Sequence, residues 1–388
     1  MRVGSLLTKA AKHLSLFRYC AGPSPQPSPW EGEGAIQTRL YNRAMDRPAH
    51  HYHPLVRSVA RALRERCGVE PEAAIVVACS GGADSVALLR VLTMLADRRK
   101  WRLKLIVGHV QHHLRDAAEA DAAFVEALAQ ELGLPYVRKD VRPGDLPGNM
   151  EANARRLRYQ ALGEIAGAHD ASLIATAHHA DDQLETLLMR ILRGSSVAGL
   201  RGIAWSKAQP WDQGKALAVI RPMLGVDQDE IIALLDRLGQ PYREDATNLD
   251  TDRTRAKLRH EVLPVLNEIQ NDAPQKAGEL VEHFRDLYEV LRADAAEELE
   301  QAEREDGALT ISRQAARKMN RAILSEMLRQ ALIDLGVPAG RVTRNALLPV
   351  IAAAQDTAGG TRSFAFANST RLVVTSEVIL IITDSSAR

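Results

Sequence analysis

Cysteine, aromatic residues and long apolar runs are all scarce in this sequence of 388 residues. Its three cysteines, Cys20, Cys67 and Cys79, form no CxxC pair, which excludes a disulfide framework and a cysteine-rich metal site. A reducing, cytoplasmic compartment is therefore expected. No stretch of about 18 apolar residues occurs, so no membrane contact is expected. The net charge of +1 gives no sign of a polyanion partner by itself, although a sum says nothing about distribution.

The composition is that of a globular protein of more than one domain. Hydrophobic residues make up 46% and charged residues 26%, and the length exceeds what one hydrophobic core usually supports. The first residues differ, because 21–34 are rich in proline, serine and glycine and cannot build a packed core. We expect residues 1–48 to be a disordered or spurious extension, with Met45 as an alternative start. A targeting peptide is the other interpretation.

Short apolar runs alternate with helical patterns from residue 73 to residue 239. Such alternation predicts a doubly wound, mainly parallel α/β sheet with ligands at the carboxyl ends of its strands. The expected strands are 73–78, 102–110, 135–141, 172–178 and 216–224. We expect this catalytic domain to cover residues 49–268. A helical linker domain at 269–337 and a small C-terminal α+β module at 338–388, with a β-hairpin or small sheet from residue 359, complete the predicted organisation.

A glycine-rich loop, Ser80-Gly81-Gly82-Ala83-Asp84-Ser85, follows the first expected strand and opens a helix. Its glycines allow backbone N–H groups to converge on one anion, and the helix N-terminus adds its dipole. Asp84 beside a phosphate indicates an intervening Mg²⁺. A plain Gly-Gly turn with a capped helix is the structural alternative. No GxxxxGK[ST] is present, which excludes a Walker-type nucleotide site.

The loop resembles the PP-loop of the ATP-pyrophosphatase superfamily, whose members use ATP to adenylate an oxygen and release pyrophosphate. Four further clusters, at 109–115, 151–159, 177–186 and 243–264, make the chain similar to the tRNA(Ile)-lysidine synthase family over roughly residues 70–266. The resemblance implies ATP-dependent attachment of free L-lysine to C2 of the wobble cytidine in tRNA(Ile) with a CAU anticodon, releasing AMP. The family usually has other residues at Gln111, His113, Ala256 and Lys257.

Several charged residues near the expected strand ends are candidates for this chemistry. Asp181 or Asp182 lies at helical spacing from Glu185, so these carboxylates can share a direction and hold a lysine ammonium or a metal. An acid cluster favoured by the helix dipole is the alternative. Arg155 joins them as a catalytic candidate, with a solvated surface position as its alternative. The expected ATP-binding residues are Ser80, Gly81, Gly82, Asp84, Ser85 and His109, with Asp84 also on the metal. The expected lysine- or cytidine-binding residues are His112, Arg115, His178, His179, Arg255, Arg259 and His260.

Basic and acidic residues are segregated along the chain. Basic stretches at 98–104, 186–211 and 313–329 are offset by an acidic segment at 285–306. Arg313, Arg317, Lys318 and Arg321 recur at spacings near four and are predicted to contact the tRNA body. A solvated helix face is the alternative. The sequence does not decide whether the chain forms a homodimer.

Two other functions compete with lysine transfer. A PP-loop tRNA 2-thiolase generally needs active-site cysteines, and only Cys79 lies near the loop. A non-catalytic ATP-binding module would need neither tRNA nor the carboxylates Asp84, Asp181, Asp182 and Glu185.

Overall fold

The computed structural model describes residues 53–112, 118–209, 217–243, 253–305, 308–357 and 359–383. The extension expected at residues 1–48 lies outside these ranges. No helix in the described part of the chain is both long and apolar enough to cross a membrane.

The larger sheet has six strands in the order β3-β2-β1-β4-β6-β5. The strands are β1 (Ala74–Ala78), β2 (Lys104–Gln111), β3 (Tyr136–Asp140), β4 (Leu173–Ala175), β5 (Ser206–Gln209) and β6 (Leu217–Ile220). Every pairing is parallel except that of β5, which runs antiparallel along the edge beside β6. The predicted doubly wound, mainly parallel α/β sheet is therefore confirmed.

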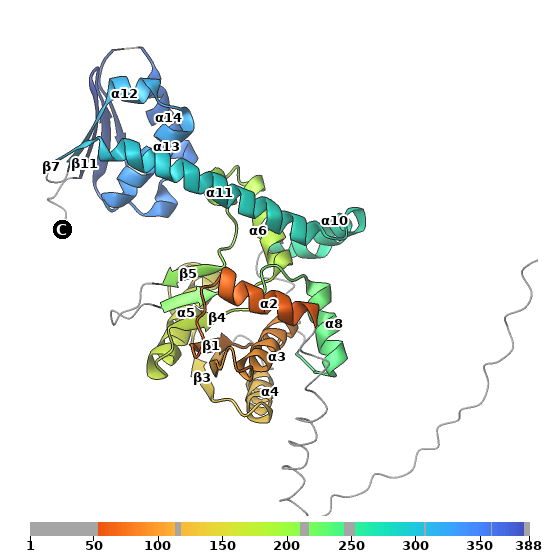
Figure 1. Cartoon of the computed structure of the whole chain (residues 1–388). Coiled ribbons are helices and arrows are strands. Elements are labelled where there is room, and N and C mark those ends of the chain that lie inside the picture. The colour runs from red at the N-terminus through yellow and green to blue at the C-terminus, as the bar shows by residue number, and fades with distance from the viewer. Residues whose placement is uncertain are drawn as a thin grey trace, which may run out of the picture. The chain divides into compact units, whose positions relative to one another are not determined.

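Helices cover both faces of this sheet (Figure 1). They are α2 (Pro54–Glu65), α3 (Ala83–Ala96), α4 (Ala118–Glu131), α5 (Met150–Ala168) and α8 (Gln228–Leu238). Alternate residues of β1 point to opposite faces, so Ile75 and Val77 join one apolar cluster with α2, α3, α4 and α8, while Val76 joins another with α5. The central strand β1 is buried on both sides, as its unbroken apolar run indicated, whereas the edge strands β3 and β5 are more exposed.

Strand order reverses at β1, because β2 and β3 lie on one side of it and β4 and β6 on the other. In open α/β sheets this reversal creates a crevice at the carboxyl ends of the strands. The glycine-rich loop follows β1, and His178 and His179 follow β4. The fold therefore brings these two segments to the same crevice.

A smaller helical cluster follows the sheet. It contains α6 (Ala180–Leu192), α7 (Val197–Leu200), α9 (Arg253–Lys257), the π-helical turn η4 (Leu258–Val262), α10 (Leu263–Ile269) and α11 (Ala273–Glu300). Leu184 and Leu187 of α6 pack with Leu258 of η4 and Val281 of α11. This packing anchors the helix that begins directly at the crevice.

The C-terminal sheet is antiparallel and has five strands in the order β7-β8-β11-β10-β9. Its strands are β7 (Glu303–Glu305), β8 (Ala308–Ser312), β9 (Arg362–Ala365), β10 (Thr370–Val374) and β11 (Val378–Thr383). The β-structure expected from residue 359 is confirmed. The sheet packs with α12 (Arg313–Lys318), α13 (Arg321–Asp334) and α14 (Arg344–Gln355); the 3-10 turns η2 (Pro143–Asp145) and η5 (Ala339–Arg341) complete the elements.

The segment 269–337, expected to form a helical linker domain, also contains the strands β7 and β8. Leu309 and Ile311 alternate with more exposed neighbours, and β8 pairs with β11 from Val378 to Ile382. The apolar core of this module runs from Ala295 to Ile381 and so crosses the expected boundary at residue 338. The residues of β7 are all charged and exposed, so they show no apolar alternation that would have indicated the change from helix to strand.

Candidate functional site

The glycine-rich loop adopts a tight turn at the carboxyl end of β1. Gly81 has a φ of 95°, a conformation that glycine adopts without steric cost. The Ser85 hydroxyl accepts hydrogen bonds from the backbone N of Ser80 (3.1 Å) and of Gly81 (3.2 Å), and it donates to the Gly82 carbonyl (2.9 Å). Ser85 is buried, so its first role is to hold the loop in shape. Gly82 is the N-cap of α3, which leaves the first amides of that helix without intrahelical partners.

His179 joins three carboxylates at the crevice. It is 3% exposed, and its Nδ1 lies 3.2 Å from Asp181, while its Nε2 lies 3.6 Å from Asp84 and 3.7 Å from Asp182. Burial alone would lower its pKa, but the hydrogen bonds to Asp181 and Asp84 and the charge of Asp182 raise the pKa of His179 to about 10. His179 is therefore an imidazolium that links the loop after β1 to the start of α6.

Asp182 and Glu185, one helical turn apart on α6, hold two arginines. Glu185 is fully buried and accepts from Arg255 Nε at 2.9 Å and from Arg259 Nε at 2.5 Å. Asp182 accepts from Arg259 at 3.1 Å, and the charges of His179 and both arginines outweigh burial, so the pKa of Asp182 is lowered. Arg255 and Arg259 lie one turn apart across α9 and η4, and each side chain stays more than one third exposed. They are fixed in place with part of each guanidinium open to solvent.

Three further histidines are neutral at pH 7. Burial lowers the pKa of His109, whose Nδ1 lies 2.9 Å from the Cys79 carbonyl, and lowers the pKa of His112 and of His178 to about 4. His178 Nδ1 and Thr176 Oγ1 form a 2.9 Å hydrogen bond, and Arg158 donates to His112 at 3.3 Å. Within the described part of the chain, His109 Nε2 has no hydrogen-bond partner. His109 therefore retains hydrogen-bonding capacity beside the loop.

The remaining residues predicted from the sequence, where the structure describes them, do not belong to the network of His179, the carboxylates and the two arginines. Arg155 is exposed and stacks over the Tyr159 ring at 5.2 Å, and its charge contributes to the lowered pKa of His178. His260 is exposed and takes no part in the Glu185 network, although its neighbour Arg259 does. Arg115 and the segment 244–252 lie outside the described residues.

The predicted tRNA-contacting stripe is wrong for Arg313. This side chain is 1% exposed and donates to the carbonyls of Ala353 (2.8 Å) and Thr375 (2.7 Å) and to Asp356 Oδ1 (2.7 Å). The four residues also belong to two helices, since α12 ends at Lys318 and α13 begins at Arg321. Arg317, Lys318 and Arg321 remain exposed. A spacing near four indicated one helix face, but the chain turns between the two helices.

Two further residues contribute contacts to the site: Gln228, which carries no signal in the sequence, and Arg243, which begins the cluster 243–264. Gln228, in the first turn of α8, donates its side-chain amide to Asp84 Oδ1 at 3.0 Å, and its backbone N donates to Asp181 Oδ2 at 3.0 Å. Arg243 places its backbone N 2.9 Å from the Gly81 carbonyl. Both contacts join segments far apart in sequence, so local pattern reading does not find them.

The two described cysteines are poorly suited to nucleophilic chemistry. Cys79 is 2% exposed, and Cys67 is also buried. Burial raises the pKa of both thiols, that of Cys67 to about 11. Since the thiolate is the reactive form, neither resembles an activated cysteine.

Asp84 is the side chain best placed for a divalent cation. Its carboxylate is 37% exposed in the first turn of α3, beside the phosphate loop. Among the described residues no group of three His, Cys, Asp or Glu side chains is arranged as a metal site. Mg²⁺ usually takes one or two carboxylates and completes its shell with water and substrate phosphates. The donor set therefore fits a cation that arrives with a nucleotide.

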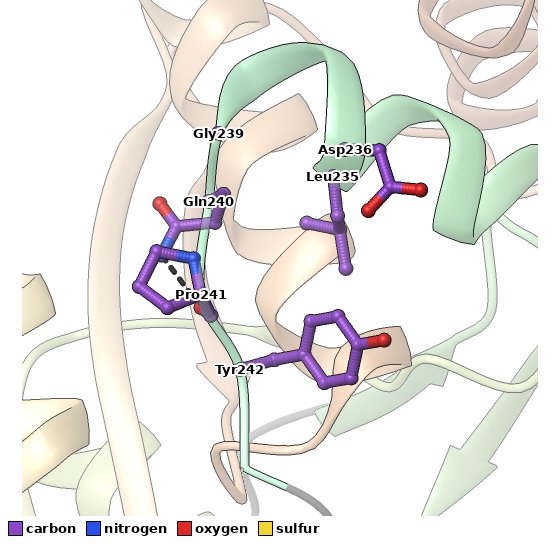
Figure 2. Close-up of a pocket in the computed structure, with 6 residues that line it drawn as sticks. All are labelled: Leu235, Asp236, Gly239, Gln240, Pro241 and Tyr242. Carbon is purple, nitrogen blue, oxygen red and sulfur yellow. Dashed lines mark hydrogen bonds between the residues drawn. The ribbon is translucent and has the colours of Figure 1, made fainter. Parts of the chain in front are cut away.

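A pocket of about 470 Å³ lies outside this crevice, between the end of α8 and the segment leading to Arg243. Figure 2 shows its lining residues, Leu235, Asp236, Gly239, Gln240, Pro241 and Tyr242. None of the predicted catalytic or binding residues is among them. The predicted catalytic and ATP-binding residues that the structure describes lie instead around the reversal of strand order.

Comparisons with known proteins agree with this geometry. The PP-loop domain family model matches residues 52–266. A tRNA(Ile)-lysidine synthase of Symbiobacterium thermophilum is 43% identical over 252 residues, covering 63% of this chain and 51% of the relative. One from Geobacter sulfurreducens is 36% identical over 66% of this chain and 54% of the relative, and one from Rhodopirellula baltica is 35% identical over 62% and 65%. The chain spans about half the length of the first of these relatives.

Proposed function

Because the chain belongs to the PP-loop family, whose model matches residues 52–266, we propose that it attaches lysine to the wobble cytidine of tRNA(Ile) with a CAU anticodon. ATP first adenylates the C2 oxygen of the cytidine, and lysine then displaces AMP. The observation that carries the proposal is the convergence of Asp84, His179, Asp181 and Asp182 beside the phosphate loop. Curated relatives that carry the lysidine synthase name align over this region.

The first step needs a good leaving group at C2. The cytidine oxygen attacks the α-phosphorus of ATP, the bond to the β-phosphate bridging oxygen breaks, and pyrophosphate leaves. The loop amides and the N-terminus of α3 bind the phosphates, and Ser85 holds the loop in the required shape. Asp84 would hold a Mg²⁺ ion, which would supply neutralisation of the phosphate charge. His109 lies at the end of the adjacent strand, where its buried neutral ring packs beside the loop and supports it.

The second step needs an oriented amine. The lysine amine attacks C2, the C2–O bond breaks, and AMP leaves with the former cytidine oxygen. Glu185 has both oxygens engaged by Arg255 and Arg259, so it positions these cations and leaves lysine to another group. Asp181 uses only Oδ2 toward His179 and Gln228. We assign the lysine ammonium to Asp181, while Arg255 and Arg259 face anionic substrate groups.

A direct test is incorporation of labelled lysine into tRNA(Ile) with a CAU anticodon in the presence of ATP and Mg²⁺. Label that depends on both ATP and this anticodon supports the proposal. ATP turnover without label, under conditions where a known lysidine synthase is active, contradicts it. Incorporation of labelled sulfur from a sulfur donor, with no incorporation of labelled lysine, would instead favour thiolation.

A further inference from the structure

A basic surface lies on the PP-loop domain away from the crevice. It consists of Arg57, Arg61 and Arg64 on α2 together with Arg99 and Lys100 in the turn before β2, all of them exposed. Arg64 joins the two segments, because its guanidinium lies 5.8 Å from the ring centre of the buried Trp101. Residues separated by more than thirty positions in sequence therefore form one surface.

The positive charge of this surface is not compensated. Among the described residues, no carboxylate lies within ion-pair distance of these five side chains. The acidic residues near them include Glu65, Asp97 and Glu72; the backbone N of Glu72 donates to the Trp101 carbonyl, and its carboxylate pairs with Arg102. Five other arginines of the domain do have an acidic partner: Arg66 pairs with Glu282, Arg90 with Glu131, Arg102 with Glu72, Arg138 with Glu119 and Arg243 with Asp121. The five cations of the surface, by contrast, are left to pair with an external anion.

Helix α2, which carries three arginines of this surface, is firmly anchored. Leu55, Val56, Val59 and Leu63 are fully buried in the apolar core. Helix α2 packs beside α3 and α8 (Figure 1). Arg57, Arg61 and Arg64 recur at helical spacing on the opposite side, so like charges are held next to one another. Such like-charged pairs destabilise a helix, and a bound polyanion removes this repulsion.

We propose that this surface, the α2 basic surface, binds the phosphate backbone of the RNA substrate away from its anticodon. Arginine is suited to phosphate because its planar group donates two parallel hydrogen bonds. The exposed side of α2 presents no large apolar side chain of the kind that inserts into a membrane interface. This inference rests on the proposed function, which supplies an RNA as the partner.

The position of the surface defines which part of the RNA it contacts. Arg99 and Lys100 precede the amino end of β2, whereas the crevice lies at the carboxyl ends of the strands. The eight residues of β2 separate the two ends by about 26 Å at 3.3 Å per residue. The surface therefore contacts the tRNA body while the wobble base lies in the crevice.

The test compares two triple variants of the full chain. Arg57→Ala/Arg61→Ala/Lys100→Ala removes three charges, and Arg57→Lys/Arg61→Lys/Lys100→Arg retains them at the same positions. Affinity for tRNA(Ile) is measured by filter binding across a range of salt concentrations, without ATP or lysine. We expect the alanine variant to bind at least about tenfold more weakly, with a salt slope reduced by about two to three, and the charge-retaining variant to match the wild type.

Steady-state kinetics add a second readout. The alanine variant should raise the KM for tRNA while kcat and the KM for lysine stay unchanged, because the surface is remote from the reacting atoms. Unchanged tRNA affinity and salt slope in a variant that melts like the wild type would overturn the inference, whether or not binding to an acidic protein or to anionic vesicles is lost. Since binding is measured without chemistry, a chain that binds tRNA through this surface but transfers no lysine would refute only the proposed function.

Discussion

At the scale of single residues, the site is a chain of alternating charges. Arg255 and Arg259 contact Glu185 and Asp182, Asp182 lies beside His179, and His179 reaches Asp84 and Asp181. Opposite charges at these distances stabilise one another most where water is excluded. Asp84 and the two arginines are the more exposed members, and in the proposed function they face substrate together with Asp181; the buried Glu185, Asp182 and His179 hold them in place.

Replacing Asp84 by Asn separates cation binding from tRNA binding. The substitution keeps the size and the hydrogen bond from Gln228 but removes the charge that Mg²⁺ requires. We expect lysine incorporation to fall at least about 100-fold, the scale of losing a charge-stabilising group at a reacting phosphate. tRNA affinity in a filter assay should remain that of the wild type. Incorporation at the wild-type rate would contradict the assignment.

His178 makes folding stability depend on pH. Burial lowers its pKa from 6.5 to about 4, so between these values the unfolded chain is protonated while the folded chain is not. The unfolded state then binds more protons, and the free energy of unfolding must fall as the pH drops from 6.5 toward 4. In His178→Gln this fall should be smaller, as measured by urea unfolding across the range. His112 contributes with the same sign, so equal slopes in the wild type and the double variant His112→Gln/His178→Gln would refute the account.

At the scale of helices and strands, periodic patterns were reliable where the structure is local. The apolar runs located the five predicted strands of the parallel sheet, and Gly239, at the end of α8, adopts the left-handed conformation that stops a helix. The patterns failed where distant segments decide the outcome. β8 is a strand because β11 pairs with it, and β5 adds an antiparallel edge that no alternation announced.

Arg313 illustrates how a surface pattern can conceal a structural residue. Its guanidinium binds the end of α14 and the β10–β11 turn, so Arg313→Ala should leave several buried carbonyls without a donor. We expect a loss of about 3 kcal/mol or more in the stability of the C-terminal module. Lys318→Ala, at an exposed position on the same helix, is the matched control and should cost well under 1 kcal/mol. Chemical unfolding of both variants checks this, and equal stability would contradict the structural role.

At the scale of the whole molecule, the small net charge conceals a strong separation of charge. The acidic segment at 285–306 offsets the α2 basic surface and the cations around the crevice. The loop and the histidine–carboxylate motif could be found in the sequence because each is contiguous. The contact of Gln228 with Asp84 joins residues 144 positions apart, and the pairing of Glu185 with Arg255 joins residues 70 apart, so only the fold reveals them.

The most direct measurement is the mass of the wobble nucleoside. tRNA(Ile) with a CAU anticodon is incubated with the chain, ATP, Mg²⁺ and lysine, then digested to nucleosides. The account predicts a nucleoside with the mass of cytidine plus lysine less one water, absent when ATP is omitted or when Asp84→Asn replaces the wild type. An unmodified or sulfur-containing wobble cytidine, from a preparation that binds both ATP and this tRNA, would contradict it.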